Sequence, residues 1–431
     1  MIIQSHMYDI NGLRFVHIPS QTKNISHLTF FTNTGELYND HHPIGTSHFV
    51  EHMFFRGTTN RKPSDIFPEA ARIGAELNAY TYFQNCEYYI SCLSKYFVDA
   101  ANLLCDAFFN STFSSEETEH ERNVILSEIS MWDTEPNNNF YSDSMLKTFG
   151  KDNPFSRKII GTVETVNRIT NKDIISFVNN HYHRNNLVLI YHGDMAESDV
   201  VKIISALVPK KTQFLHSSYS IRNFISSDKF VIKDISKPNI FINDTSSDIS
   251  MSGIRDYTPH YSHNYHAARI CQDALGGVTN SILCDIFREK LALCYSCFLS
   301  PITYSYPNCQ TLNLTSSFLP KNFDRFVSEL RNFLNNFNSS MITSDLISAT
   351  KNKLSFSLLQ LKHSLPDYMA YLGPRILNQE YNKDISIENE IELIQNTPEE
   401  DIRTIADSGM FKFDSFKWSF MTSDENHIKE Y

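Results

Sequence analysis

The chain has 431 residues, of which 41% are hydrophobic and 20% are charged, a composition typical of globular proteins that fold in water. Its 13 glycines exclude collagen-like and glycine-rich architectures. The formal net charge of −11 argues against a nucleic-acid partner, which would need a basic surface, and permits cationic peptides as partners.

The first half of the chain is predicted to begin with two strands and to continue through helices, a hairpin and further helices. Apolar patterns predict strands at 13–18, 27–34, 77–82, 88–93 and 187–191, and helices at 45–55, 64–74, 95–109, 115–149, 171–180 and 197–207. Three glutamates closely follow Ser115, and acidic residues of this kind favour a helix start.

A polar, serine-rich linker is predicted at 213–228, and after it the order of elements repeats. Strands are predicted at 229–233, 239–244, 294–300, 310–316 and 416–420, and helices at 260–275, 280–290, 323–337 and 344–362. We therefore predict an α+β protein of two similar domains, residues 1–212 and 229–431, related as a pseudo-repeat. Each is expected to be a largely antiparallel sheet packed with helices.

Targeting and membrane signals are weak. The first 15 residues lack the basic start and apolar core of a secretory signal peptide, so we expect a cytoplasmic protein, or an organellar-matrix protein if a transit peptide has been removed. Residues 291–320 carry no charge, but Pro301, Pro307 and many polar residues interrupt them. This segment predicts two buried strands and a turn, and no membrane span.

The chemically most informative segment is 45–57, which contains His48-x-x-Glu51-His52. Helix positions i, i+3 and i+4 share one face, so both imidazoles can reach one ion with the carboxylate beside it. Zinc favours such ligands in a four-coordinate site that keeps one position for water. We predict that Glu51 is the general base on a zinc-bound water. The competing interpretation is a solvated helix face with two incidental histidines.

The predicted helix 115–149 offers two further carboxylates, Glu121 and Glu128, which lie seven residues apart and therefore share one helix face. One glutamate could complete the metal site, and the other could orient a histidine from behind. The residues alone do not decide between the two, and they also fit two surface glutamates.

The motif from Gly45 to Gly57 resembles the zinc helix of the pitrilysin superfamily, whose inverted zincin motif is His-x-x-Glu-His. This superfamily includes insulin-degrading enzyme and the mitochondrial processing peptidases. Its third ligand is a glutamate about 76 residues after the second histidine, which is the spacing between His52 and Glu128. The resemblance implies one Zn²⁺ per chain held by His48, His52 and Glu128, with Glu121 behind a ligand.

Two other segments extend the resemblance. Leu77–Thr81 is similar to the edge strand with which relatives bind substrate, which implies substrate contacts at Asn78, Ala79 and Tyr80.

Residues 287–295 resemble a second-half motif in which an arginine and a tyrosine assist catalysis, which implies these roles for Arg288 and Tyr295. Two departures accompany this motif. Leu291-Ala292 stands where the family usually has Arg-Gly, and the preceding glycine-rich loop is reduced to Gly276-Gly277.

The resemblance implies a processing-peptidase-like zinc endopeptidase that hydrolyses peptides or unfolded segments inside a chamber. Single-chain relatives have four such domains, so a two-domain chain implies a homodimer in which Arg288 and Tyr295 act in trans. The alternative is a non-catalytic peptide-binding or structural subunit, although such members typically lack motif residues. A purely structural zinc site fits poorly, because such sites usually have four protein ligands.

The remaining histidines and cysteines have simpler interpretations. His181-x-His183 lies at a helix end before an apolar strand, where the resemblance implies packing, and His41-His42 lies in a loop just before the helix of the His-x-x-Glu-His motif. Metal binding is the minority alternative for both pairs. The eight scattered cysteines predict buried free thiols, and neither a disulfide framework nor a zinc site built on Cys294-x-x-Cys297 is expected.

Overall fold

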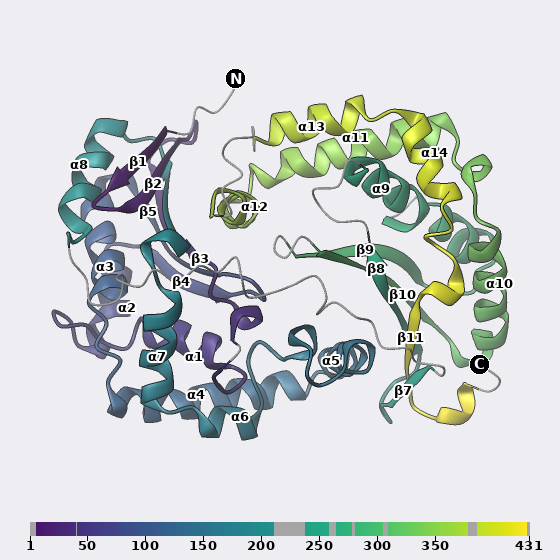
Figure 1. Ribbon diagram of the computed structural model, residues 1–431, viewed down its shortest axis with the longest axis horizontal. Helices are drawn as coiled ribbons and strands as arrows, with labels where there is room; N and C mark the ends of the chain where they lie inside the picture. The colour runs from purple at the N-terminus through teal and green to yellow at the C-terminus, as the bar shows by residue number, and fades with distance from the viewer. Residues whose placement is uncertain are drawn as a thin grey trace. The chain divides into compact units, whose positions relative to one another are not determined.

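The computed structural model describes residues 6–39, 41–210, 238–257, 264–277, 281–304, 309–377 and 386–428. The chain forms two compact units, and each is built around one β-sheet (Figure 1). The first unit contains the described residues up to 134, those from 157 to 210, and 369–377. The second contains 135–156, the described residues from 238 to 368, and those from 387 onward.

Six strands form the sheet of the first unit, in the order β1-β2-β6-β3-β5-β4. Their bounds are β1 His6–Ile10, β2 Leu13–Pro19, β3 Ile25–Thr32, β4 Glu76–Thr81, β5 Cys86–Leu93 and β6 Leu187–Gly193. Neighbouring strands are antiparallel except β2 and β6, which are parallel. Within the described residues β4 pairs only with β5, so β4 is an edge strand.

The sheet of the second unit repeats this topology. Its strands are β7 Asn239–Ile242, β8 Ile249–Tyr257, β9 Ser296–Tyr304, β10 Cys309–Phe318 and β11 Lys417–Thr422. Their order, β7-β11-β8-β10-β9, matches β2-β6-β3-β5-β4 strand for strand in chain order, and β7 and β11 again form a parallel pair. The predicted class, two similar α+β domains with largely antiparallel sheets, is confirmed.

Helices cover one face of the first sheet and enclose its core. They are α1 Thr46–Met53, α2 Pro63–Arg72, α3 Phe97–Phe109, α4 Ser115–Asp133, α6 Val163–Arg168, α7 Asn171–His181 and α8 Glu197–Leu207. Alternate strand residues such as Phe30, Tyr88 and Leu189 are fully buried in this core. Burial of each such side chain contributes about 1.5–3 kcal/mol to stability. The core holds α1 rigidly, because Phe49 and Val50 are part of it.

The helices of the second unit are α5 Pro136–Phe149, α9 Tyr265–Gln272, α10 Phe323–Asn336, α11 Ser344–Leu361, α13 Ile387–Asn396 and α14 Glu399–Asp407, together with the helical turn η8 Cys284–Lys290. Buried apolar residues from α9, α10, α11 and α14 form a second core with strands β8 to β11.

Two helices, α5 and the end of α12 (Leu365–Leu377), belong to a different unit from most of their neighbours in the sequence. α5 follows the first-half helix α4 but packs against β7, β8 and β11. In the reverse direction, residues 369–377 of α12 belong to the first unit. There Arg14 donates to the carbonyl oxygens of Ile376 (3.4 Å) and Leu377 (3.2 Å). Gly373 lies so close to Phe31 that a Cβ would come within 2.5 Å of the ring.

The structure corrects several predicted elements. The single helix expected at 115–149 is two helices, α4 and α5, separated at Glu135. Glu135 is extended because the ring of Pro136 disfavours helical backbone in the residue before it. The strand β8 was not predicted, since the alternation of Ile249 and Met251 with two serines is short and ends at Gly253. The elements β1, α6, α12, α13 and α14 were also not predicted.

Other expectations concern the linker, the charge-free segment and the cysteines. The predicted linker 213–228 and strand 229–233 lie outside the described residues, so the boundaries of the domains remain a prediction. Within residues 291–320 the two expected strands are present as β9 and β10, whereas residues 305–308, where the turn between them was expected, lie outside the described residues. Among the described residues no helix has both the length and the apolar character that crossing a bilayer requires. Cys86, Cys92, Cys105, Cys271, Cys284 and Cys297 are buried free thiols, and Cys294 is a partly exposed free thiol.

Candidate metal centre

The short helix α1 carries three polar residues on one face and packs its opposite face into the core. Phe49, Val50 and Met53 are fully buried, and α1 packs against α4 and α7. His48, Glu51 and His52 occupy the remaining face, as their i, i+3, i+4 spacing predicted.

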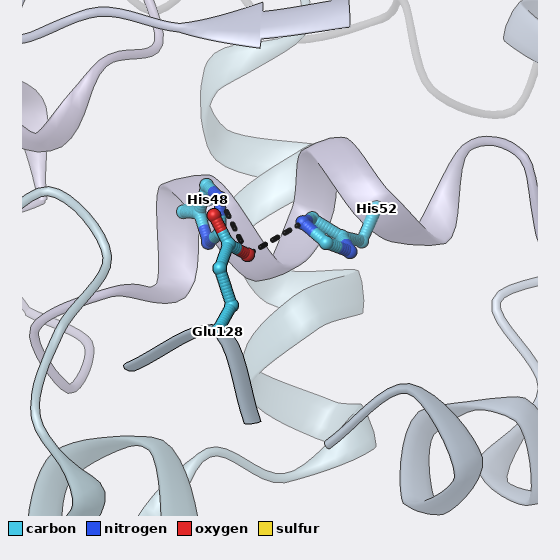
Figure 2. Close-up of side chains that lie close together, drawn as sticks. All are labelled: His48, His52 and Glu128. Atoms are coloured by element: carbon cyan, nitrogen blue, oxygen red, sulfur yellow. Dashed lines mark ion pairs between the residues drawn. The ribbon is translucent and has the colours of Figure 1, made fainter. Parts of the chain in front are cut away.

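The structure brings His48, His52 and Glu128 of α4 together (Figure 2). Glu128 Oε2 lies 3.7 Å from His48 Nε2 and 3.6 Å from His52 Nε2. One ligand atom from each residue lies within 4.8 Å of the other two. Ligands about 2.0–2.1 Å from a tetrahedral zinc ion are roughly 3.4 Å apart, so this spacing fits zinc closely. Burial, helped by the charge of His52, lowers the pKa of His48 to about 3, which leaves its imidazole neutral.

Glu121 lies behind His52 and apart from the group of three. Its Oε1 is 2.7 Å from His52 Nδ1, and its Oε2 forms an ion pair with Nε of Arg56. Burial opposes ionisation of this 1%-exposed side chain, but hydrogen bonds from His52 and Arg56 lower its pKa below the ordinary value. A carboxylate on Nδ1 leaves Nε2 of His52 directed at the cluster, which is how outer carboxylates orient metal-binding histidines.

Glu51 lies beside the cluster without being part of it. The hydroxyl of Thr81, the last residue of β4, donates to Glu51 Oε2 over 2.8 Å. Burial raises the pKa of Glu51 above its ordinary value, although His52 and the Thr81 hydrogen bond oppose the shift. A carboxylate with a raised pKa is a better proton acceptor, as a general base requires.

The edge strand β4 places the three predicted substrate-binding residues near this base. Asn78 and Tyr80 are exposed, whereas Ala79 is buried, in the alternation of a strand with one face in the core. The Ala79 amide donates to Oδ1 of Asn78 over 2.9 Å, so a side chain takes up this amide.

Arg288 and Tyr295 lie together in the second unit, Arg288 in η8 and Tyr295 just before β9. The guanidinium carbon is 5.3 Å from the centroid of the Tyr295 ring, and Tyr295 is 77% exposed.

The two positions at which the sequence departs from the family motif lie close to Arg288 and Tyr295: Ala292 lies between them, and Gly276 precedes them. Ala292 has φ +51°, a left-handed backbone that favours glycine. Gly276 packs tightly, since a Cβ there would come 2.7 Å from the Cβ of Leu299.

The residues of the other histidine pairs differ in burial, since His181 and His183 are buried, His42 is partly buried and His41 is exposed. His183 Nε2 lies 2.5 Å from the carbonyl oxygen of Asn180, and His42 Nε2 lies 3.2 Å from the hydroxyl of Ser176. Burial lowers the pKa of His181 to about 3. Within the described residues these histidines belong to no group able to hold a metal ion.

Sequence reasoning missed two contact residues, Arg56 and Thr81. Arg56 follows His52 by one helical turn, so the helix period could have indicated its neighbourhood to Glu121. The contact of Thr81 with Glu51 depends on how the β4–β5 hairpin meets α1, and no local pattern indicates that.

Two protein-family descriptions match this sequence. Insulinase (Peptidase family M16) matches residues 14–163, which include α1 and α4. Peptidase M16 inactive domain matches residues 168–354, which include Arg288 and Tyr295.

Curated relatives and solved structures agree with these matches. The chain is 26% identical over 376 residues to an uncharacterized zinc protease of Rickettsia felis, with 87% of each chain covered. It is 32% identical over 195 residues to the mitochondrial-processing peptidase subunit beta of Rattus norvegicus, which covers 45% of this chain and 39% of that protein. A protease from Helicobacter pylori shares the fold with a TM-score of 0.81 at 16% identity, over 98% of this chain and 100% of that chain. An M16-like peptidase from Alicyclobacillus acidocaldarius has a TM-score of 0.77 at 18% identity, over 98% of each chain.

Proposed function

Because the chain belongs to peptidase family M16, we propose that it is a zinc-dependent endopeptidase acting on peptides or unfolded segments. The observation that carries this proposal is the arrangement of His48, His52 and Glu128 around one point, with Glu51 beside them. The three side chains would hold Zn²⁺, with Glu121 orienting His52. When bound, zinc lowers the pKa of water and polarises a carbonyl oxygen.

Glu51 is the proposed general base. It takes a proton from the water that attacks the peptide carbonyl, and it returns that proton to the leaving amine when the C–N bond breaks. Burial raises the pKa of Glu51, which favours the first of these steps, the uptake of the proton.

Substrate is proposed to bind as an added strand on β4. An extended peptide that pairs with an exposed sheet edge gains main-chain hydrogen bonds, and its alternate side chains are read by neighbouring residues. Asn78 and Tyr80 would meet substrate side chains on the exposed face, and Ala79 would offer its main chain. The Ala79 amide must then exchange Asn78 Oδ1 for a substrate carbonyl.

Arg288 and Tyr295 are proposed to stabilise the oxyanion and to position substrate. We propose that they do so in a homodimer, acting on the metal site of the partner chain. In a twofold dimer each of the two sites would be complete. That one relative is named as a subunit supports an assembled state.

The experiment that tests this function compares wild type with Glu51→Gln. The variant keeps zinc, because Glu51 is not a proposed ligand, and loses at least about a thousandfold in kcat on an unfolded or extended peptide. Glu116→Gln, an exposed glutamate at the start of α4, is the matched control and keeps wild-type activity. Activity of Glu51→Gln within tenfold of wild type, about 1.4 kcal/mol in barrier, would contradict the role of Glu51.

The second candidate is a non-catalytic peptide-binding subunit of the same family. It is favoured by the description of the second matching family, the inactive domain, at residues 168–354. One experiment distinguishes the two functions: peptide binding and peptide cleavage are measured for zinc-loaded wild type, alone and with added partner subunits. Binding without cleavage under both conditions supports the non-catalytic role.

A further inference from the structure

The hydroxyl of Thr81 lies between the proposed base and a buried thiol. On one side it donates to Glu51 Oε2 over 2.8 Å. On the other side Cys86 Sγ is 3.6 Å from Thr81 Oγ1. Cys86 is fully buried and begins β5, directly opposite Thr81 in the strand register. Cys86, Thr81 and Glu51 therefore form one continuous series of hydrogen bonds.

The available hydrogens decide which group donates and which accepts in this series of hydrogen bonds. A threonine hydroxyl has one hydrogen, and Glu51 accepts it, so the oxygen of Thr81 is left as an acceptor. Burial raises the pKa of Cys86, which therefore stays a thiol and can donate its S–H. A further neighbour of the thiol is the Ser47 hydroxyl at 3.7 Å, which donates its own hydrogen to the carbonyl oxygen of Thr34 over 2.6 Å and therefore not to the sulfur.

The carbonyl oxygen of Thr34 is the competing acceptor for the thiol, since it is also 3.6 Å from Cys86 Sγ. A carbonyl oxygen can accept two hydrogen bonds, so the thiol hydrogen is shared between Thr34 and Thr81, and the share that reaches Thr81 completes the series S–H···O–H···carboxylate. Hydrogen bonds that share a hydroxyl in this way strengthen one another.

We propose that Thr81 is a positioning residue for Glu51, and that the Cys86 thiol orients the Thr81 hydroxyl for this task. The inference rests on the proposed function, because it concerns the group that accepts the proton. Thr81 holds one carboxylate oxygen of Glu51, which fixes the plane of the carboxylate and leaves the other oxygen for water. Since Thr81 ends the edge strand β4, one side chain joins the strand proposed to bind substrate to the base.

The first experiment compares Thr81→Val with Thr81→Ser in zinc-loaded protein. Valine has the shape of threonine without the hydroxyl, so kcat is expected to fall at least tenfold while KM stays within twofold and zinc content is unchanged. Serine restores the hydroxyl, so Thr81→Ser recovers most of kcat. Thr32→Val is the matched control, because this buried strand hydroxyl makes no hydrogen bond within the described part of the chain. It leaves kcat unchanged.

The second experiment tests the thiol by a double-mutant cycle. Cys86→Ala removes the donor and lowers kcat about threefold or more, whereas Cys86→Ser keeps a donor and has a smaller effect. In a Thr81→Val background Cys86→Ala has no further effect on kcat, because its partner hydroxyl is gone. Cys105→Ala, at another buried thiol of the same unit, is the control for the loss of packing.

Several results would overturn the proposal. Thr81→Val with kcat within twofold of wild type would remove the hydroxyl from catalysis. If Thr81→Ser loses as much kcat as Thr81→Val, the hydroxyl is not what matters, and Thr81 serves the structure of β4. If KM alone rises, Thr81 contributes to substrate binding by β4 and does not position Glu51. If the effects of Thr81→Val and Cys86→Ala on kcat are additive, the thiol does not act through the Thr81 hydroxyl. Absence of hydrolysis by zinc-loaded wild type would be a failure of the proposed function instead, and is recognised before any variant is compared.

Discussion

At the scale of single residues, Glu121 and Glu128 show what a motif leaves open and what contacts add. Both lie on one face of α4, so their spacing alone does not separate a ligand from a residue behind a ligand. In the structure Glu128 Oε2 is near-equidistant from both histidines, whereas Glu121 contacts His52 on the opposite ring nitrogen, Nδ1. The three residues of α1 were predictable because their convergence depends on one helical turn.

This difference predicts unequal effects on zinc binding. Glu128→Gln removes a proposed ligand charge and is expected to lower zinc affinity at least a hundredfold. Glu121→Gln keeps the shape behind His52 and is expected to lower affinity about tenfold to a hundredfold, as for other outer carboxylates. Chelator competition with each purified variant measures both affinities. If Glu121→Gln empties the site while Glu128→Gln retains zinc, the assignment is wrong.

Ala292 carries a second prediction at this scale. Its φ of +51° costs an alanine about 1–2 kcal/mol relative to an unstrained backbone, and glycine avoids that cost. Part of the gain is offset by the greater freedom of glycine in the unfolded chain. Ala292→Gly is therefore expected to raise the free energy of unfolding by about 0.5–1 kcal/mol in urea titrations.

The matched control for Ala292→Gly is Ala349→Gly. Ala349 is exposed within the helix α11 of the same unit, so the same substitution there relieves no strain and lowers stability by about 1 kcal/mol. Equal effects at both positions would show that the backbone of Ala292 is not strained.

At the scale of elements, the helix α1 depends on the residue that precedes it. Gly45 has φ +95°, and a Cβ there would come 2.9 Å from Gly161 Cα and 3.0 Å from the carbonyl oxygen of Ile160. These neighbours are backbone atoms, which do not move aside cheaply. The position of the zinc-binding face therefore depends on a glycine outside the His-x-x-Glu-His motif.

Gly45→Ala is accordingly expected to destabilise the first unit by about 2 kcal/mol or more and to reduce zinc content. Gly74→Ala is the matched control, since Gly74 also has a positive φ, +65°, but a Cβ added there would meet no neighbour within 4 Å. It should cost only about 1 kcal/mol, with zinc retained. Urea unfolding and zinc analysis of both variants distinguish the steric clash at Gly45 from the cost of a positive φ. Equal losses of stability and zinc in the two variants would contradict the role of the Gly45–Gly161 contact.

Element prediction succeeded where the pattern was local and strong. The apolar strands of the first half and the amphipathic helices of both units follow their residue periods. The strand β8 was missed because its apolar alternation is interrupted at Gly253, and its place in the sheet depends on pairing with β10 and β11. The break between α4 and α5 was readable in Pro136, whose effect on Glu135 is local.

At the scale of the whole molecule, the exchange of α5 and α12 between the units could not be predicted from sequence. Both helices are ordinary amphipathic segments, and only contacts such as Arg14 with Ile376, or α5 with β7, reveal the unit to which each belongs. The repeated strand order, by contrast, was foreshadowed by the repeated order of predicted elements.

The proposed homodimer makes a prediction at this scale. Glu51→Gln and Tyr295→Phe chains are each expected to be inactive alone. If Arg288 and Tyr295 act in trans, a mixed dimer has one intact site, so mixing the two variants restores activity to as much as about a quarter of wild type when subunits exchange freely.

Differential tagging and co-purification show whether mixed dimers have formed. Mixed dimers that remain inactive, or a fully active monomer measured by light scattering, would contradict the in-trans arrangement.

The exchange of helices has a consequence for how the protein is made. The first unit includes residues 369–377, so a nascent chain that has already produced α8 still lacks the helix that covers Phe31. At roughly 5–20 residues per second, translation of the intervening stretch of about 170 residues takes on the order of 10–30 seconds. During this interval Phe31 and the open edge of β4 are exposed on the ribosome, which makes the unfinished chain a client for chaperones that shield nascent polypeptides.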